Sequence, residues 1–195
     1  YPELRAELET LGYRFFSGGD TEVLLKGYHA WGEALLPKLN GMFAFAVWER
    51  DKQSLFIARD RLGVKPLYLS RTGERLRFAS SLPALLKGGD IAKTLDAVAL
   101  NHYLNFHAVV PAPRTILAGV EKLPPATWMR IDADGKVEQK TWWALQFGPQ
   151  GEEVGYGFEE WRDRTLQTMR EAVKIRQRAA VDVGVLLSGG VDSSM

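Results

Sequence analysis

One stretch near the C-terminal end decides the fold there: Val183 to Ser194, which reads VGVLLSGGVDSS. Its first part, Val183 to Leu187, is short and wholly apolar, as is typical of a strand buried in a parallel sheet. Ser188 and two glycines follow, and glycine allows the backbone to turn sharply with its N–H groups uncovered. Together with the N-terminus of the helix expected next, these N–H groups predict a nest for phosphate oxygens.

The same loop carries a carboxylate, Asp192, after its glycines. A carboxylate repels phosphate directly, so Asp192 is expected to hold a Mg²⁺ ion that bridges the phosphate groups. The hydroxyl groups of Ser188 and Ser193 add two donors. The alternative is a plain strand-to-helix turn in which Asp192 or Ser193 caps the helix. The loop lacks the Gly-Lys-Ser/Thr ending of a Walker loop, but six specified positions after an apolar strand favour phosphate binding.

The upstream sequence predicts helices and short antiparallel strands. Apolar residues recur at helical spacing over residues 20–36, where Asp20 or Thr21 can cap the first turn. Four short strands are expected to form one antiparallel meander, with apolar residues on both faces of the first: 43–47, 54–59, 67–70 and 76–79. Further elements are expected after the meander: helices at 81–87 and 95–106, an extended connector over 107–127, and a hairpin formed by 127–131 and 136–143.

The composition limits the classes of protein and of partner. The 195 residues are 46% hydrophobic with a net charge of +1, which supports a packed core and gives no strong attraction to nucleic acid or anionic membrane. No apolar run approaches the roughly 20 residues that a membrane span needs. A cytoplasmic protein with no nucleic-acid or membrane partner is therefore expected. Cysteine is absent, so these residues supply neither a disulfide nor a thiol nucleophile.

The domain organisation is indicated by a cluster of glycines. Five glycine and proline residues fall within 148–157, and such composition predicts a domain boundary. A charged amphipathic helix is expected beyond the boundary, over 159–178, ahead of the buried strand and its loop.

Several strings resemble one family. The terminal loop is similar to the pyrophosphate loop of the ATP-pyrophosphatase superfamily. Three earlier strings resemble the glutaminase domain of asparagine synthetase: Asn40–Ala46 (NGMFAFA), Ala58–Tyr68 (ARDRLGVKPLY) and Phe78–Ser81 (FASS). Two more resemble the connector of the same family: Val110–Ile116 (VPAPRTI) and Lys122–Pro125 (KLPP). The resemblance extends in order over nearly the whole chain.

This resemblance implies a class II glutamine amidotransferase of the asparagine synthetase type. The implied fold is the C-terminal part of an α+β N-terminal-nucleophile sandwich (the class II glutaminase domain) with its connector, over residues 1–147. It is followed over 158–195 by the start of an α/β ATP-pyrophosphatase domain, which is adenine nucleotide α-hydrolase-like. The implied activity hydrolyses glutamine and amidates a carboxylate, aspartate by default, through an acyl-adenylate. ATP and Mg²⁺ are the implied cofactors, glutamine and the carboxylate are the implied partners, and a homodimer is a further expectation.

The resemblance also assigns site residues. Asp20, in the string Gly19-Asp20-Thr21-Glu22, is the candidate for binding the α-ammonium group of glutamine, and helix capping is its alternative role. The implied ATP-binding residues, with Asp192 as the metal ligand, are Leu187, Ser188, Gly189, Gly190, Asp192, Ser193 and Ser194. No catalytic residue is assigned, because the cysteine nucleophile of the family is expected upstream of Tyr1. This chain alone is therefore expected to be inactive.

One charged pair is expected to be structural. Arg59 and Asp60 lie at a strand end, where they could be mistaken for a catalytic pair. An internal ion pair that fixes the following turn, Gly63–Pro66, is the favoured interpretation.

Alternative activities stay open on the sequence. The strings Phe106–Val110 (FHAVV) and Tyr28–Gly32 (YHAWG) resemble the branch that makes N-acetylglutaminylglutamine amide, and Ala126-Thr127 replaces the Gly-His more usual in asparagine synthetases. A β-lactam-synthetase-like ligase with an inactive glutaminase domain would instead cyclise its substrate. A non-catalytic nucleotide-binding module is a third interpretation, which the intact loop from Ser188 to Ser194 disfavours.

Overall fold

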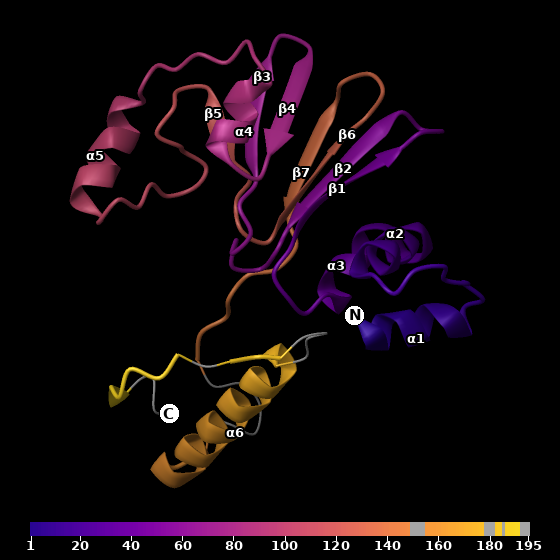
Figure 1. Ribbon diagram of the computed structural model, residues 1–195, viewed down its shortest axis with the longest axis vertical. Coiled ribbons are helices and arrows are strands. Elements are labelled where there is room, and N and C mark those ends of the chain that lie inside the picture. The colour runs from indigo at the N-terminus through magenta and orange to yellow at the C-terminus, as the bar shows by residue number, and fades with distance from the viewer. Residues whose placement is uncertain (149–154, 178–181, 185, 192–195) are drawn as a thin grey trace. The chain divides into compact units, whose positions relative to one another are not determined.

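The computed structural model describes residues 1–148, 155–177, 182–184 and 186–191. The chain divides into two compact units, Tyr1–Leu145 and Gln146–Met195. Figure 1 shows the strands of both sheets in the first unit and one long helix in the second.

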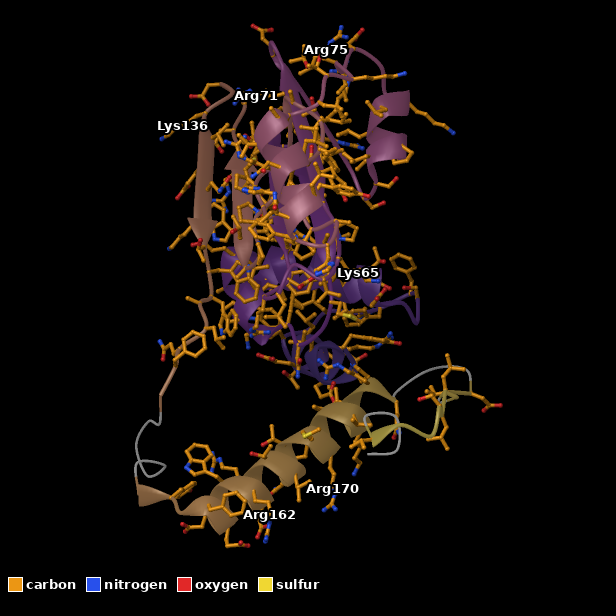
Figure 2. The ribbon with its side chains drawn as sticks, turned by 90° about the vertical axis from the view of Figure 1, so that its left-hand side faces the viewer. Lys65, Arg71, Arg75, Lys136, Arg162 and Arg170 are labelled. Carbon is orange, nitrogen blue, oxygen red and sulfur yellow. The ribbon has the colours of Figure 1, made fainter. Side chains whose placement is uncertain are left out.

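The first unit contains two antiparallel sheets. The first sheet has the strand order β1-β2-β6-β7, formed by Ala44–Glu49, Ser54–Arg59, Thr127–Ile131 and Val137–Thr141. The second sheet has the order β4-β3-β5, formed by Arg75–Ala79, Tyr68–Thr72 and Val120–Lys122. The tips of two hairpins lie at the same end of the unit, where Arg71 Nη2 donates to Gly135 O at 3.5 Å (Figure 2).

The prediction of a single four-stranded meander is wrong. The chain leaves the first sheet after Arg59 and begins the second at Tyr68, so the two predicted hairpins belong to different sheets. The physical reason is long-range pairing: Tyr68 pairs with Lys122, more than fifty positions away, and β2 pairs with β6. The strand β5 lies within the stretch that the sequence predicts to be an extended connector.

Six helical segments accompany the sheets in the first unit. They are α1 (Pro2–Thr10), α2 (Asp20–Trp31), η1 (Gly32–Ala34), α3 (Leu35–Lys38), α4 (Leu82–Lys87) and α5 (Ala97–Asn105). The helix predicted over 20–36 is interrupted at Gly32, whose φ of +56° takes the backbone out of the right-handed helical region. Gly27 allows α3 to approach α2 closely, because a Cβ there would lie 2.8 Å from Leu35 Cδ1.

The packed side chains define a layered sandwich. The first core cluster packs α2 and α3 on the first sheet and consists of Tyr28, Leu35, Leu36, Leu39, Phe56, Ala58 and Trp128. The second cluster joins the two sheets and consists of Ile57, Leu67, Leu69 and Leu123. The third packs α4 on the second sheet, through Leu85, Leu117 and Val120. Consecutive residues of β2 therefore face different layers, which gives the order helices, sheet, sheet, helix (Figure 1).

The second unit contains α6, from Phe158 to Arg176, close to the predicted bounds of 159–178. The N-terminus of α6 is fixed by Glu160 Oε2, which accepts from Gly157 N at 2.7 Å. Within the described ranges of both units, none of the helices combines the length and the apolar character that crossing a membrane requires.

Residue 185, in the middle of the buried strand predicted at Val183–Leu187, lies outside the described residues, so only the residues on either side of it can be compared with the prediction. The four described residues (183, 184, 186 and 187) lie outside any strand, and Leu186 is 97% exposed. A parallel strand needs neighbouring strands to satisfy its main-chain groups and to cover its side chains. The described residues of the second unit contain no such neighbour.

Candidate functional site

Asp20 is the first residue of α2, and its carboxylate is exposed. The N-cap is Gly19, without a side-chain cap bond, so the prediction that Asp20 or Thr21 caps the helix is wrong. Among the described contacts, the carboxylate accepts one hydrogen bond, from Thr21 Oγ1 to Asp20 Oδ1 at 3.4 Å. An anionic side chain in the first turn is stabilised by the helix dipole. Asp20 therefore presents a negative charge to solvent from the start of a rigid helix.

Glu22, two residues further along α2, is buried with only 6% of its surface exposed. Its carboxylate accepts from the loop before the helix: from Ser17 N at 2.8 Å, from Ser17 Oγ at 2.7 Å and from Phe16 N at 3.2 Å. It also forms an ion pair with Lys26. Burial by itself would raise the pKa of Glu22, but the hydrogen bonds from Lys26, Ser17 and Phe16 outweigh burial and lower this pKa to about 2. Glu22 is therefore a carboxylate held in its charged form.

Other side chains complete the attachment of the loop from Tyr13 to Gly19. Arg5 Nη1 donates to Ser17 O at 2.7 Å, and Lys26 Nζ donates to Arg14 O. The guanidinium group of Arg5 and the ammonium group of Lys26 each lie over the ring of Phe15, at 4.4 and 4.5 Å from its centroid. Phe16, in contrast, is 91% exposed. The loop thus has a fixed main chain although it belongs to no helix or strand.

No role was predicted for Glu22 from the sequence, although it is the last residue of the string Gly19-Asp20-Thr21-Glu22. The signal was available in the spacing. A Glu at the third helical position, after an N-cap glycine, is placed to accept from main-chain N–H groups that precede the helix. Here it reaches Ser17 and Phe16 rather than the N-cap itself.

Arg59 and Asp60 do not form the predicted ion pair. The Asp60 carboxylate, 2% exposed, accepts from the main chain of Leu62, Val64 and Lys65, at 2.9 to 3.2 Å, and from Phe43 N at 3.2 Å. The Arg59 guanidinium group donates to the carbonyl groups of Gly63, Lys65 and Leu123. Burial lowers the pKa of Arg59, and the nearby charge of Asp60 acts in the opposite direction. The pair fixes the turn, as the sequence predicts, but each member does so through the main chain.

A hollow with a volume of about 1000 Å³ lies beside α2 in the first unit. Its lining includes Tyr28, Glu49 and Arg130, and Asp20 is not part of it. Tyr28 Oη donates to Glu49 Oε1 at 2.8 Å. Burial, together with the Glu49 carboxylate, raises the pKa of Tyr28 to about 12. No residue of this hollow was predicted as a site residue.

The glycine-rich loop of the second unit is described from Leu187 to Val191, and Leu187, Ser188, Gly189 and Gly190 are exposed. Gly189 has φ +77°, a conformation that favours glycine, and Gly190 N donates to Ser188 Oγ at 3.5 Å. This turn is compatible with a phosphate nest. Asp192, Ser193 and Ser194 lie outside the described residues. In the described ranges, no group of three or more His, Cys, Asp or Glu side chains could hold a metal ion.

The comparisons with known proteins give the class of the chain. Residues 1–143 match the family model described as a glutamine amidotransferase domain, so the chain belongs to this family. Residues 164–195 match the model described as asparagine synthase. The two matches follow the same order as the two units. The α+β sandwich expected of a class II glutaminase is confirmed by this membership and by the two packed antiparallel sheets.

The curated relatives that the chain matches along its whole length include glutamine-hydrolysing asparagine synthetases. Asparagine synthetase [glutamine-hydrolyzing] 1 of Bacillus subtilis is 39% identical over 194 residues, which is 100% of this chain and 30% of that protein. Asparagine synthetase [glutamine-hydrolyzing] 3 of the same organism is 33% identical over 98% of this chain and 30% of its own length. The chain therefore spans about 30% of these curated relatives. A solved structure of glutamine phosphoribosylpyrophosphate amidotransferase from B. subtilis has a TM-score of 0.47 and 19% identity, covering 72% of this chain and 26% of that one.

Proposed function

We propose that this chain is part of an ATP-dependent ligase that hydrolyses glutamine and uses the ammonia to convert aspartate into asparagine. The observation that carries the proposal is the succession of two family matches in one chain, glutamine amidotransferase at 1–143 and asparagine synthase at 164–195. We assign the amidotransferase domain with its connector to residues 1–147 and the beginning of the synthetase domain to 158–195. The names of the relatives support aspartate as the substrate.

The proposed reaction has three steps. Water hydrolyses the side-chain amide of glutamine to glutamate and ammonia. The β-carboxylate of aspartate attacks ATP, which gives an acyl-adenylate and pyrophosphate. Ammonia then attacks the acyl carbon of the acyl-adenylate, which releases AMP and forms the amide of asparagine. The chain contains no cysteine, so a cysteine nucleophile for the first step would come from residues outside it.

Asp20 would bind glutamine through the α-ammonium group. The support is its exposed carboxylate on the first turn of a twelve-residue helix, where no cap bond occupies it. A charge-assisted hydrogen bond to an ammonium group contributes about 1.5–3 kcal/mol, which is roughly a tenfold to hundredfold change in affinity.

The experiment for Asp20 uses the full-length protein. Asp20→Asn should raise the KM for glutamine at least tenfold and leave ammonia-dependent synthesis within twofold. Asp51→Asn, an exposed aspartate in the β1–β2 turn, is the matched control and should change neither activity. If Asp20→Asn leaves the KM for glutamine unchanged, the assignment is wrong.

The loop from Leu187 to Ser194 would bind the phosphate groups of ATP, with Asp192 holding Mg²⁺. The left-handed φ of Gly189 and the exposed Ser188 support a phosphate-binding turn. A bound Mg²⁺ ion would supply positive charge against the phosphate oxygens. The remaining proposed ATP contacts are Gly190, Ser193 and Ser194.

The test of the loop measures pyrophosphate release by the full-length protein with Mg-ATP. Asp192→Asn should lower aspartate-dependent release at least tenfold while glutaminase activity stays measurable. Asp163→Asn, on the exposed surface of α6, is the control. Aspartate should support release, whereas N-acetylglutaminylglutamine should not; the reverse preference would reject asparagine as the product. We also propose that the full-length protein is a homodimer. Its sedimentation in solution tests this proposal.

A further inference from the structure

The loop from Tyr13 to Gly19 leads directly into the residue proposed to bind glutamine. Two glycines, Gly18 and Gly19, precede Asp20, and glycine loses more conformational freedom on ordering than any other residue. Without further contacts, the start of α2 would therefore be loosely defined. The structure shows which contacts remove that freedom.

A chain of hydrogen bonds connects Glu22 to the N-cap of α2. Gly19 N donates to Ser17 Oγ at 3.4 Å, and Ser17 Oγ donates to Glu22 Oε2 at 2.7 Å. Because Glu22 Oε2 also accepts from Ser17 N at 2.8 Å, both polar hydrogens of Ser17 point to one carboxylate oxygen. Gly19, the residue just before Asp20, is thus linked through Ser17 to the buried side chain of Glu22, two positions after Asp20.

The two carboxylates of the first turn have different surroundings. Glu22 is buried and is neutralised by its ion pair with Lys26. Asp20 is exposed, and the ion pairs formed by the described residues do not include it. A ligand cation therefore meets the charge of Asp20, while Lys26 compensates the charge of Glu22.

We propose that Glu22 is a positioning residue for glutamine binding: through Ser17 it fixes the main chain at Gly19 and so holds the Asp20 carboxylate in place. This inference rests on the proposed role of Asp20. A side chain that must meet a small ligand in one geometry gains from such support by residues behind it.

The test compares Glu22→Gln with wild type in the full-length enzyme. Gln has the shape of Glu but lacks the negative charge that pairs with Lys26, and an NH₂ donor replaces one of its acceptor oxygens. The KM for glutamine should rise about tenfold, with kcat and ammonia-dependent synthesis within twofold. Trypsin should cut faster after Arg14, since the loop is no longer held. Glu7→Gln, which changes an exposed carboxylate paired with Lys38, should alter neither KM nor cleavage.

A second variant guards against misfolding. Ser17→Ala removes the linking hydroxyl but keeps the ion pair between Glu22 and Lys26, and it should raise the KM for glutamine severalfold. An unchanged KM in both variants, with a raised KM in Asp20→Asn, would overturn the positioning role alone. An unchanged KM in Asp20→Asn would overturn the proposed function of Asp20 itself. An equal fall of glutamine-dependent and ammonia-dependent activity would show that Glu22 only supports folding.

Discussion

Arg59 and Asp60, neighbours in the chain, bind the main-chain carbonyl and N–H groups of one residue, Lys65. Arg59 Nε donates to Lys65 O at 2.8 Å, and Lys65 N donates to Asp60 Oδ2 at 3.0 Å. The turn between these residues carries the chain from the first sheet to the second. Two charged side chains therefore fix the turn that joins the two sheets of the sandwich, although they do not bond to each other.

Asp60→Asn should lower the free energy of unfolding by about 2–3 kcal/mol. An amide keeps one acceptor oxygen and turns an NH₂ group toward N–H donors, so buried main-chain groups lose their acceptor. Urea unfolding of the full-length protein measures the change, with the exposed Asp51→Asn as control, expected within about 0.5 kcal/mol. Equal stability of the two variants would contradict the role assigned to Asp60.

The effect of a substitution at Ala126 on the free energy of unfolding should depend on the left-handed backbone conformation of this residue. Ala126 is buried with φ +49°, its N–H donates to Asp60 O at 2.8 Å, and its carbonyl accepts from Trp142 N at 2.8 Å. Ala126→Gly should change the free energy of unfolding by less than about 1 kcal/mol, since relief of strain and loss of a buried methyl group oppose each other. Ala126→Val should lower it by more than about 2 kcal/mol, because a β-branched residue is strained in this region.

The control for Ala126 is Ala92→Val, at an exposed position without a positive φ. This variant should unfold within about 0.5 kcal/mol of wild type. If Ala126→Val is as stable as Ala92→Val, then the left-handed conformation at residue 126 is wrong.

Tyr28 should titrate later than an ordinary tyrosine. Its folded-state pKa of about 12 lies above the ordinary value of 10.0. The contribution of Tyr28 to stability is therefore complete below pH 10 and is lost as the pH rises through about 12. Absorbance at 295 nm should show a phenol phase near pH 12 that Tyr28→Phe removes. A phase near pH 10 that disappears in the variant would contradict the buried bond to Glu49.

Glu22 should make stability depend on acid. Its pKa of about 2 in the folded state lies below the ordinary value of 4.5, so its stabilising effect is complete above about pH 4.5 and is lost as the pH falls toward 2. The difference in stability between wild type and Glu22→Gln should accordingly shrink over this interval. Thermal unfolding between pH 2 and 6 measures the difference, and a gap that widens with acid would contradict the prediction.

Local sequence patterns predicted several elements well. The strands Ser54–Arg59 and Thr127–Ile131 have the predicted bounds, because β-branched and aromatic residues mark them. The helix expected from Ser81 begins at Leu82, and Ser81 Oγ accepts from Ala84 N at 3.3 Å as its cap.

Features that depend on distant residues could not be predicted. The division into two sheets follows from pairing of Tyr68 with Lys122 and of β2 with β6, for which no local pattern exists. Phosphate binding was predicted from glycines and a carboxylate, yet the strand expected before the loop needs neighbours that the described residues do not include. At Asp20, the position on a helix was predicted, whereas the anchoring by Glu22 depends on a loop whose path only the fold defines.

The strand β2 has a consequence for slow fluctuations of the first unit. Both of its edges are paired, with β1 and with β6, and its side chains enter the cores on both faces of the sheet. Amide protons of Phe56, Ile57 and Ala58 can then exchange with deuterium only when the whole unit opens. Their exchange rates report its global free energy of unfolding, and they provide an internal reference for every variant discussed above.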